Sequence, residues 1–287
     1  MGIATRIDDV IHSLSPGIKE KFLALIEWFK PFEGVVVVSF SGGLDSSVVL
    51  AAATLAKGVD KVVAVTAVSP IRLDDDIKWA KTVVDVLNVK HLVFEVDELS
   101  DPNFVANPPN RCYFCKKLLA GKLLEIAGDY GAEVIVDGTN ASDVSDFRPG
   151  YLAFKEVGIR SPLLELGITK DEVRAVAKIL ELPNWGEQPR ACLATRIPYG
   201  EPISAEKLQR IKEAERIVKD IVKLTVVRVR DHGDVARIEV GNGERRKFFD
   251  ESIMDRVNLE LRKLGYRYVA LDLQGYRSGS LNEALRK

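Results

Sequence analysis

The fold of this chain is decided by the stretch Val35-Val36-Val37-Val38-Ser39-Phe40-Ser41-Gly42-Gly43-Leu44-Asp45-Ser46-Ser47. Its first part is an apolar run without alternation, as in a strand buried within a parallel sheet. The glycine pair that follows allows the main chain to approach a bound group closely, and the apolar stretch after it predicts a helix. Strand, glycines and helix together predict a phosphate cradle, because the amides at a helix N-terminus attract anions.

Within this cradle, backbone amides and hydroxyls would donate to phosphate oxygens. Asp45 would hold Mg²⁺ shared with the phosphates, because a bare carboxylate repels them. The alternative is a tight turn in which Asp45 is an ordinary helix N-cap. Two rival nucleotide motifs are missing from the sequence, since it has no Gly-x4-Gly-Lys-Ser/Thr and Gly241-Asn242-Gly243 lacks the third glycine of the dinucleotide fingerprint. The predicted nucleotide-binding residues of this stretch are Ser39, Ser41, Gly42, Gly43, Asp45 and Ser46, with Ser41 and Ser46 as the hydroxyl donors.

Outward from this motif, short apolar runs alternate with helical patterns, which is typical of a doubly wound α/β fold with a parallel sheet. Residues 137–168 are rich in Gly, Asn, Asp and Pro, and predict a functional loop region beyond a strand end. The predicted strands are Val35–Phe40, Val62–Val68, His91–Val96 and Val134–Val136, all buried on both faces. The predicted helices cover residues 18–30, 45–57, 72–88, 115–130 and 170–180.

A proline-rich connection, residues 182–204, divides the chain into two predicted domains. Residues 1–181 would form the nucleotide-binding domain, and residues 205–287 a small α+β domain for substrate binding and oligomerisation. The elements expected in that second domain are a helix at 205–222, a hairpin of Leu224–Arg230 and Val235–Val240, a helix at 244–264 and a strand at 267–273.

Composition excludes several classes of protein. The 287 residues are 46% hydrophobic and 29% charged, as in a soluble globular chain and unlike a disordered or fibrous one. The 41 basic and 42 acidic residues give a net charge of −1, against the basic surface expected of a dedicated nucleic-acid binder. The sequence has no apolar segment of membrane-spanning length and no signal-peptide layout at Met1–Asp9, so we expect a cytoplasmic protein without a membrane partner.

Three cysteines stand at uneven spacing: Cys112 and Cys115 form a Cys-x-x-Cys motif, and Cys192 lies in the proline-rich connection. In a reducing cytosol this set favours metal binding or catalysis over disulfides. Three thiolates are one short of a closed zinc site, whereas a [4Fe–4S] cluster held by three cysteines keeps one iron open for a sulfide or a substrate. The alternatives are zinc completed by another ligand, a redox dithiol, and inert structural cysteines.

The Ser-Gly-Gly-x-Asp-Ser loop resembles that of the PP-loop ATP pyrophosphatases. Members of this family adenylylate a carboxylate or carbonyl oxygen and release pyrophosphate, so the resemblance implies AMP-forming chemistry with ATP and Mg²⁺. It implies an adenine-nucleotide alpha-hydrolase-like fold over roughly residues 15–180. It also implies that adenine and ribose bind at the ends of later strands, near Thr66 and near Gly138 and Thr139.

Nearly the whole chain resembles the LarE family, the sulfur transferases of nickel-pincer nucleotide biosynthesis. This family adenylylates a carboxylate of pyridinium-3,5-biscarboxylic acid mononucleotide and replaces the activated oxygen with sulfur. Some members sacrifice the sulfur of the cysteine that matches Cys192, whereas three-cysteine members, which this chain resembles, bind a [4Fe–4S] cluster and pass on sulfide. The motifs that carry the resemblance are Asn110–Lys116, Asp143–Gly150, Cys192–Gly200, Val227–Glu239 and Leu271–Ser280.

Three arginines are candidates for the phosphate of that substrate, because guanidinium groups bind phosphate bidentately. They are Arg196, Arg228 and Arg230, of which the last two share one face of a predicted strand; the alternative is a surface arginine ladder. Asp231, Glu239 and the run Glu244–Lys247 are interpreted as surface charge, although the family associates the position of Glu239 with its active site. The predicted catalytic residues are Asp45, Cys192 and Glu239.

Three other functions compete. A PP-loop tRNA-thiolation enzyme also fits the loop and the cysteines, but the near-zero net charge and the lack of zinc-ribbon cysteine pairs argue against it. An ammonia-using amide ligase similar to NAD synthetase would need no cysteine. A non-enzymatic ATP sensor would leave Asp45 and the cysteines without a role. The expected partners are the pyridinium mononucleotide, sulfide or another sulfur donor, and further copies of the chain in a homo-oligomer, with no nucleic acid.

Overall fold

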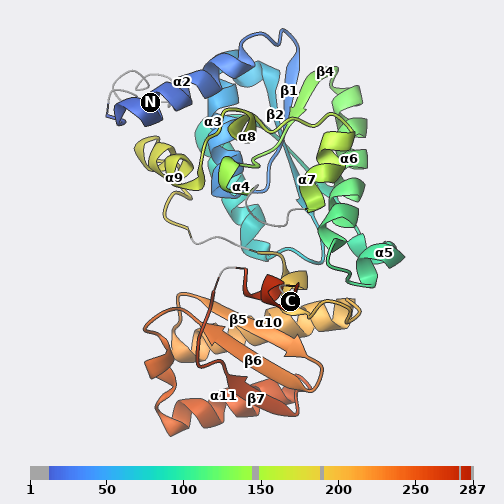
Figure 1. The fold of residues 1–287 in the computed structure, drawn as a ribbon, viewed down its shortest axis with the longest axis vertical. Coiled ribbons are helices and arrows are strands. Elements are labelled where there is room, and N and C mark those ends of the chain that lie inside the picture. Colours follow the sequence, from blue (N-terminus) through green and yellow to red (C-terminus); the bar gives the residue numbers. More distant parts are fainter. Residues whose placement is uncertain (1–12, 144–148, 188–190, 278, 286–287) are drawn as a thin grey trace. The chain divides into compact units, whose positions relative to one another are not determined.

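The computed structural model describes residues 13–143, 149–187, 191–277 and 279–285, and divides into two compact units (Figure 1). Unit 1 comprises Met1–Asp97 and Asn110–Arg190, and unit 2 comprises Glu98–Pro109 and Ala191–Lys287. The sequence interpretation placed Glu98–Pro109, which includes helix α5 (Pro102–Val105), in the nucleotide-binding domain. It groups with unit 2 because Asn107, wholly buried, donates from its side-chain amide to the carbonyls of Pro198 and Glu201 at 2.7 and 2.9 Å.

Unit 1 is built on a four-stranded parallel sheet in the order β3-β2-β1-β4, which confirms the predicted doubly wound fold. One strand differs from expectation. The run His91–Val96 was expected to be buried on both faces, but the strand that it forms is an edge strand, and Val93 on it is 46% exposed. The strands are β1 (Val35–Ser39), β2 (Val62–Val68), β3 (Lys90–Glu95) and β4 (Ala132–Val136).

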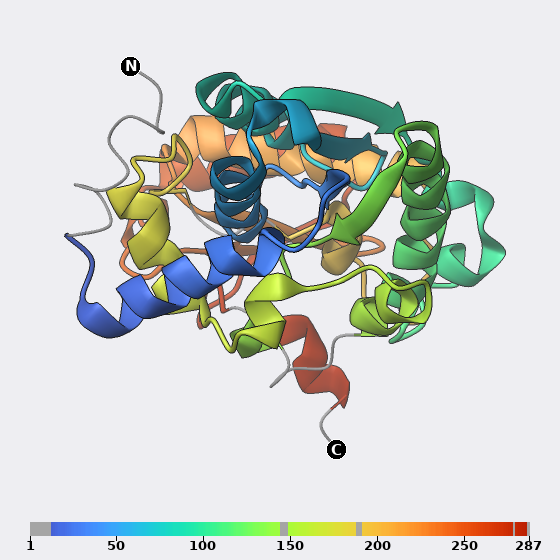
Figure 2. The same ribbon diagram turned by 90° about the horizontal axis from the view of Figure 1, so that it is seen from above.

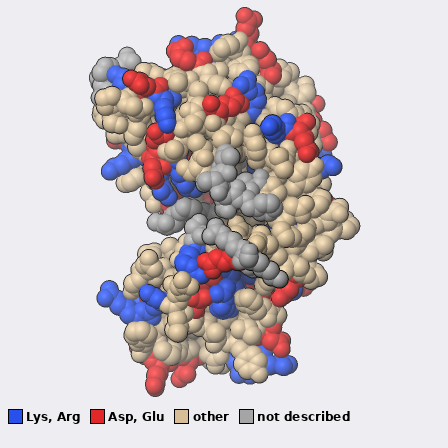
Figure 3. Space-filling view, in the orientation of Figure 1, with Lys and Arg blue, Asp and Glu red and all other residues tan. Residues whose placement is uncertain are grey.

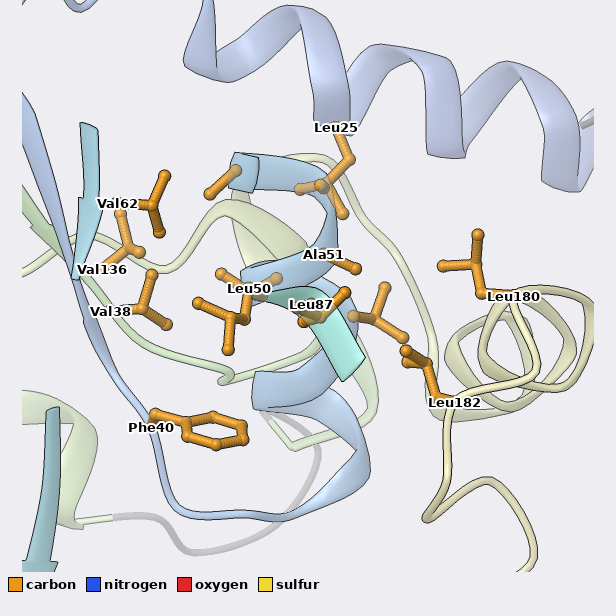
Figure 4. Close-up of a cluster of buried hydrophobic side chains, with 14 of the residues drawn as sticks. Leu25, Val38, Phe40, Leu50, Ala51, Val62, Leu87, Val136, Leu180 and Leu182 are labelled. Atoms are coloured by element: carbon orange, nitrogen blue, oxygen red, sulfur yellow. The ribbon is translucent and has the colours of Figure 1, made fainter. Parts of the chain in front are cut away.

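Helices cover both faces of this sheet (Figure 2). On one face, Val36 and Val38 of β1 belong to a core shared with α2, α3, α4 and α9; in Figure 4, Leu50 of α3 lies near Val38, with Leu25 and Leu180 farther out. On the other, Val37 packs against α6 and α7. The non-alternating valines therefore reflect two cores, one on each face. The helices are α2 (Pro16–Phe29), α3 (Leu44–Lys57), α4 (Asp74–Leu87), α6 (Arg111–Asp129), α7 (Pro149–Glu156) and α9 (Lys170–Ile179).

The region expected to be a loop, residues 137–168, contains helix α7 and the short helix α8 (Pro162–Glu165). Helix α7 packs closely on α6, since a Cβ on Gly150 would lie 3.0 Å from Lys116 Cγ and 3.2 Å from the Cys112 carbonyl oxygen. This contact with α6 stabilises a helix whose own sequence gives only a weak helical signal. Residues 144–148 of the family-like motif Asp143–Gly150 lie outside the described residues.

Unit 2 contains a three-stranded sheet in the order β5-β6-β7, with β5 and β6 antiparallel and β7 parallel to β6. Its core lies between one face of this sheet and helices α10 and α11. The helix predicted at 244–264 is shorter, because Asp250 caps its N-terminus by accepting from the Ser252 amide at 2.9 Å. The elements are α10 (Ala205–Val222), β5 (Val227–His232), β6 (Val235–Val240), α11 (Glu251–Lys263) and β7 (Tyr268–Leu271).

Two further properties concern the described residues of both units. None of their helices combines the length and the apolar character needed to cross a bilayer. On the face drawn in Figure 3, their basic and acidic side chains are interspersed, in keeping with a net charge of −1.

Candidate functional site

A cavity of about 250 Å³ opens in unit 1 at the carboxyl ends of β1, β2 and β4. The chain runs from β1 to β2 on one side, while β4 pairs with the other side of β1. In open α/β sheets this reversal of strand order is where ligands bind. The predicted nucleotide-binding residues that line the cavity are Ser39, Ser41, Gly43, Asp45, Ser46, Gly138 and Thr139.

Two glycines allow the loops around the cavity to come together. Gly42 has φ +74°, and a Cβ there would lie 2.6 Å from the carbonyl oxygen of Asp76. A Cβ on Gly138, in the loop after β4, would lie 2.6 Å from the backbone nitrogen of Ser46 in the first turn of α3. Only glycine fits either position, so the β4 loop and the N-terminus of α3 enclose the same space.

Hydroxyl groups supplement the amides at this helix N-terminus. Ser41 Oγ and Ser46 Oγ lie 3.1 Å apart, and the Gly43 amide donates to Ser41 Oγ at 3.3 Å. Ser46 Oγ also donates to the Gly43 carbonyl at 3.0 Å. These donors, together with the positive end of the α3 dipole, favour a polyanion in the cavity.

Asp45 supplies a carboxylate to the same cavity. Burial raises the pKa of Asp45, as does the negative charge of Asp143, while Lys170 lowers it. Asp45 Oδ1 accepts a hydrogen bond from Asn140 Nδ2 at 3.1 Å, and Asp143 also lines the cavity. Two carboxylates that line one cavity, beside a phosphate cradle, are oxygen ligands of the kind Mg²⁺ prefers. This donor set fits the predicted metal ion.

Thr66 lies elsewhere than the sequence interpretation suggested. Its side chain is 1% exposed, and its hydroxyl donates to the Phe40 carbonyl at 2.7 Å and contacts His91 Nε2 at 2.8 Å. The cavity wall at this level is formed by its neighbours Val65 and Ala67. The hydroxyl therefore ties the end of β1 to β2 and β3, and Thr66 itself does not line the cavity.

Sequence reasoning missed a cationic side chain in the cavity wall. Lys116 reaches the cavity from α6, with its Nζ 4.1 Å from the centre of the Phe154 ring. Burial lowers the pKa of Lys116, nearby Asp137 raises it, and Arg72, which also lines the cavity, lowers it. Lys116 ends the family-like motif Asn110–Lys116, but nothing in its spacing indicates that it faces the phosphate cradle.

The cysteines occupy both units. Cys112 is exposed and Cys115 half-buried in the first turns of α6, where positions i and i+3 share one helix face. Cys192, half-buried, precedes the short helix Leu193–Arg196 of unit 2. Within the described residues, no group of three or more His, Cys, Asp or Glu side chains is placed to hold a metal ion. The shared [4Fe–4S] site therefore stays a prediction.

Arg196 is wholly buried and makes its contacts inside unit 2. It forms a bidentate pair with Glu215, at 2.8 Å from Nε and 3.1 Å from Nη2. Its Nη1 donates to the carbonyls of Ala191 and Cys192 at 2.7 and 3.0 Å. The sequence interpretation assigned Arg196 to the substrate phosphate, but the structure places it as a support for the main chain of Cys192.

Arg228 and Arg230 both lie on β5, as predicted, on the face of the sheet opposite the helices. Arg230 donates to Glu239 at 2.7 Å, to the Thr195 carbonyl at 2.6 Å and to Ser280 Oγ at 3.0 Å. Arg228 lies 5.1 Å from the ring centre of Tyr276.

The electrostatics of this face favour an anion. Burial lowers the pKa of Arg228, and the adjacent guanidinium of Arg196 adds to the effect, so a further negative charge nearby would stabilise the cationic form of Arg228. Glu239 is 1% exposed, and its carboxylate forms ion pairs with Arg230 and Arg237 at 2.7 and 3.1 Å. A phosphate bound on this face would supply that negative charge.

Three carboxylates interpreted as surface charge are buried, and Glu239 is one of them. Asp231 is 0% exposed, bound by Arg210 at 2.6 Å and by the Tyr266 hydroxyl at 3.1 Å. Glu244 accepts hydrogen bonds from the Thr225 and Val226 amides and from Lys247. Burial alone would raise the pKa of Glu244, but these hydrogen bonds outweigh that effect and lower the pKa to about 2. The local charge pattern did not reveal that these groups have partners distant in sequence.

Comparisons with known proteins agree with this geometry. The asparagine synthase family model matches residues 33–107, which include the phosphate loop. The chain is 40% identical to an uncharacterised protein of Synechocystis over 88% of this chain and 93% of that protein. It is 37% identical to the pyridinium-3,5-bisthiocarboxylic acid mononucleotide synthase of Lactiplantibacillus plantarum, over 88% of this chain and 90% of that enzyme. It is also 33% identical to a subunit of the glutamine-hydrolysing GMP synthase of Methanocaldococcus jannaschii, over 65% of this chain and 64% of that protein.

Proposed function

Because the chain belongs to the family of ATP-using PP-loop enzymes that includes pyridinium-3,5-bisthiocarboxylic acid mononucleotide synthase, we propose that it is an ATP-dependent sulfur transferase. Its substrate is pyridinium-3,5-biscarboxylic acid mononucleotide, whose carboxylates become thiocarboxylates during nickel-pincer nucleotide synthesis. The observation that carries this proposal is the cavity at the end of β1, with its glycine loop, its helix N-terminus and Asp45.

The first step is adenylylation, which the groups in unit 1 support. A carboxylate oxygen of the substrate attacks the α-phosphorus of ATP, the bond to the bridging oxygen breaks, and pyrophosphate leaves. The loop amides and the hydroxyls of Ser41 and Ser46 bind the leaving pyrophosphate. Asp45, with Asp143, would hold Mg²⁺, which neutralises phosphate charge when bound. Lys116 and Arg72 place positive charge in the wall of the cavity, where they stabilise the phosphates.

The second step replaces oxygen by sulfur without any redox change. Sulfide attacks the acyl carbon of the adenylate, and AMP leaves with the oxygen that was activated, so the product is a thiocarboxylate. Cys112, Cys115 and Cys192 would hold a [4Fe–4S] cluster, which supplies the sulfide when bound. The pair on one face of α6 and the half-buried position of Cys192 support this assignment. Arg196 keeps the main chain at Cys192 in place through its two carbonyl contacts.

Product analysis tests this function directly. The purified protein is incubated without oxygen with ATP, Mg²⁺, the pyridinium mononucleotide and sulfide. We expect AMP and pyrophosphate to form only when the mononucleotide is present. The mononucleotide should gain mass equal to the difference between a sulfur and an oxygen atom for each carboxylate converted. Formation of ADP, or of an amide in place of the thiocarboxylate when ammonia and sulfide are supplied together, would contradict the proposal.

Substrate anchoring gives a second prediction. We expect Arg228→Ala and Arg230→Ala each to weaken binding of the mononucleotide by about tenfold to a hundredfold, because a charge-assisted contact contributes roughly 1.5–3 kcal/mol. Isothermal titration of each variant measures the affinity. The affinity for ATP should change by less than about twofold, because the two arginines are proposed to contact the phosphate of the mononucleotide and not that of ATP.

The matched control is Arg216→Ala, which removes an exposed arginine on α10 that pairs with Glu213 and Asp220. It should leave mononucleotide affinity unchanged. Arg230→Ala also deprives buried Glu239 of a partner, so thermal melting is needed to show that the variant is folded at the titration temperature. If both β5 variants bind the mononucleotide as tightly as the unmodified protein, the arginines are not the phosphate anchor.

A further inference from the structure

A buried amide from outside the phosphate loop contacts the back of that loop. Asn184 is 2% exposed and lies in the turn after α9, where Leu182 is part of the core. Its Nδ2 donates to the Gly42 carbonyl at 2.9 Å and to Ser47 Oγ at 2.9 Å. Gly42 and Asn184 are 142 residues apart in sequence, so only the folded chain brings them together.

The chemistry of its neighbours determines which end of the amide faces the loop. The Gly42 carbonyl can only accept a hydrogen bond. Ser47 Oγ gives its own hydrogen to the Gly43 carbonyl at 2.9 Å, so it too must accept from Asn184. Both contacts therefore require the NH₂ group. Asn184 Oδ1 has no hydrogen-bond partner among the described residues. Burying this oxygen without a partner costs desolvation free energy, which an apolar side chain at this position would avoid.

These contacts set the direction of the peptide bond between Gly42 and Gly43. In a trans peptide the carbonyl and the following N–H point to opposite sides. With the Gly42 carbonyl held by Asn184, the Gly43 N–H points toward Ser41 Oγ, 3.3 Å away, on the cavity side. Between two glycines the peptide can rotate at little steric cost, and the rotated form would turn a carbonyl oxygen toward a bound phosphate.

We infer that Asn184 is a positioning residue that selects the phosphate-binding orientation of the Gly42–Gly43 peptide, and so sets the affinity for the pyrophosphate part of ATP. Ser47 acts in the same way on the next peptide, because its hydroxyl donates to the Gly43 carbonyl and fixes the direction of that carbonyl. This inference rests on the proposed use of ATP at this cavity. It concerns the β- and γ-phosphates only, because AMP has no group that reaches the glycine pair as a leaving pyrophosphate does.

The test measures binding of magnesium pyrophosphate, ATP and AMP to Asn184→Asp, Asn184→Ala and the unmodified protein by isothermal titration. Asn184→Asp has nearly the same shape but lacks the NH₂ donors, and its carboxylate faces the Gly42 carbonyl. We expect it to weaken pyrophosphate and ATP binding by at least about tenfold. A tenfold loss of affinity corresponds to about the free energy of one hydrogen bond. Asn184→Ala should have a smaller effect in the same direction, and AMP affinity should change by less than about twofold.

The matched control is Asn107→Ala, which removes another fully buried asparagine, one whose amide holds carbonyls in unit 2. It should lower the melting temperature without changing pyrophosphate affinity. If both Asn184 variants melt earlier but bind pyrophosphate as the unmodified protein does, Asn184 is merely structural and the inference is overturned. An equal loss for AMP would also overturn it. If the unmodified protein binds neither ATP nor pyrophosphate, the proposed function itself fails, and the inference with it.

Discussion

Replacing Asp45 by asparagine is expected to lower the rate of AMP formation by at least about a hundredfold, the usual cost of losing a group that stabilises transition-state charge. The substitution removes the carboxylate proposed to hold Mg²⁺ but keeps an oxygen that accepts from Asn140 Nδ2. The fold should therefore remain intact. The rate is measured from AMP and pyrophosphate release at saturating ATP and mononucleotide. The matched control is Asp60→Asn, an exposed aspartate just before β2, at the amino end of the strands and so at the opposite end from the cavity.

Stability provides an independent measure of the same residue. Because burial raises the pKa of Asp45, the folded protein holds a proton there more readily than the unfolded chain, so stability falls as the pH rises through that pKa. Without ligands, Asp45→Asn should thus melt at a higher temperature than the unmodified protein at neutral pH. The gain should shrink as the pH falls toward the ordinary pKa of an aspartate. Full activity in Asp45→Asn would remove Asp45 from the catalytic site.

The three cysteines carry the second large prediction. If they hold one [4Fe–4S] cluster, then Cys112→Ala, Cys115→Ala and Cys192→Ala should each lose bound iron and reduce thiocarboxylate formation to background. The proteins are purified without oxygen and assayed with added sulfide, and iron and acid-labile sulfide are determined along with the visible absorbance. Tyr113→Phe is the matched control, since Tyr113 lies between the two α6 cysteines and its hydroxyl donates to Glu156 at 2.7 Å.

The sacrificial route predicts a different outcome. There only Cys192 is required, and each chain loses one sulfur per transfer. Cys112→Ala and Cys115→Ala would then keep their activity, and the protein recovered after product formation would be lighter by one H₂S at Cys192. That result would overturn the cluster assignment while leaving adenylylation at the phosphate loop untouched.

The parallel sheet and the phosphate loop were predictable because their signals are contiguous in the chain. The valines of β1, the glycine pair and the first turn of α3 follow one another within Val35–Ser47, and each has a strong local preference. The position of each strand within the sheet was harder to predict from the sequence. The run His91–Val96 has the composition of a buried strand, but the order β3-β2-β1-β4 places it at an edge, and strand order depends on which helices cover which face.

Side-chain burial and direction were decided by the tertiary structure. The carboxylates of Asp231 and Glu239 resemble surface charge in the sequence, yet each is buried against arginines that the fold brings to it. An arginine such as Arg196 is a residue type that often binds phosphate, but its guanidinium is buried inside unit 2, where it pairs with Glu215 on α10. Asn184 carries no local signal, because its role arises from a contact with Gly42 across the fold. A sequence pattern reports the preferences of neighbouring residues, whereas these roles depend on partners that only folding brings within hydrogen-bond distance.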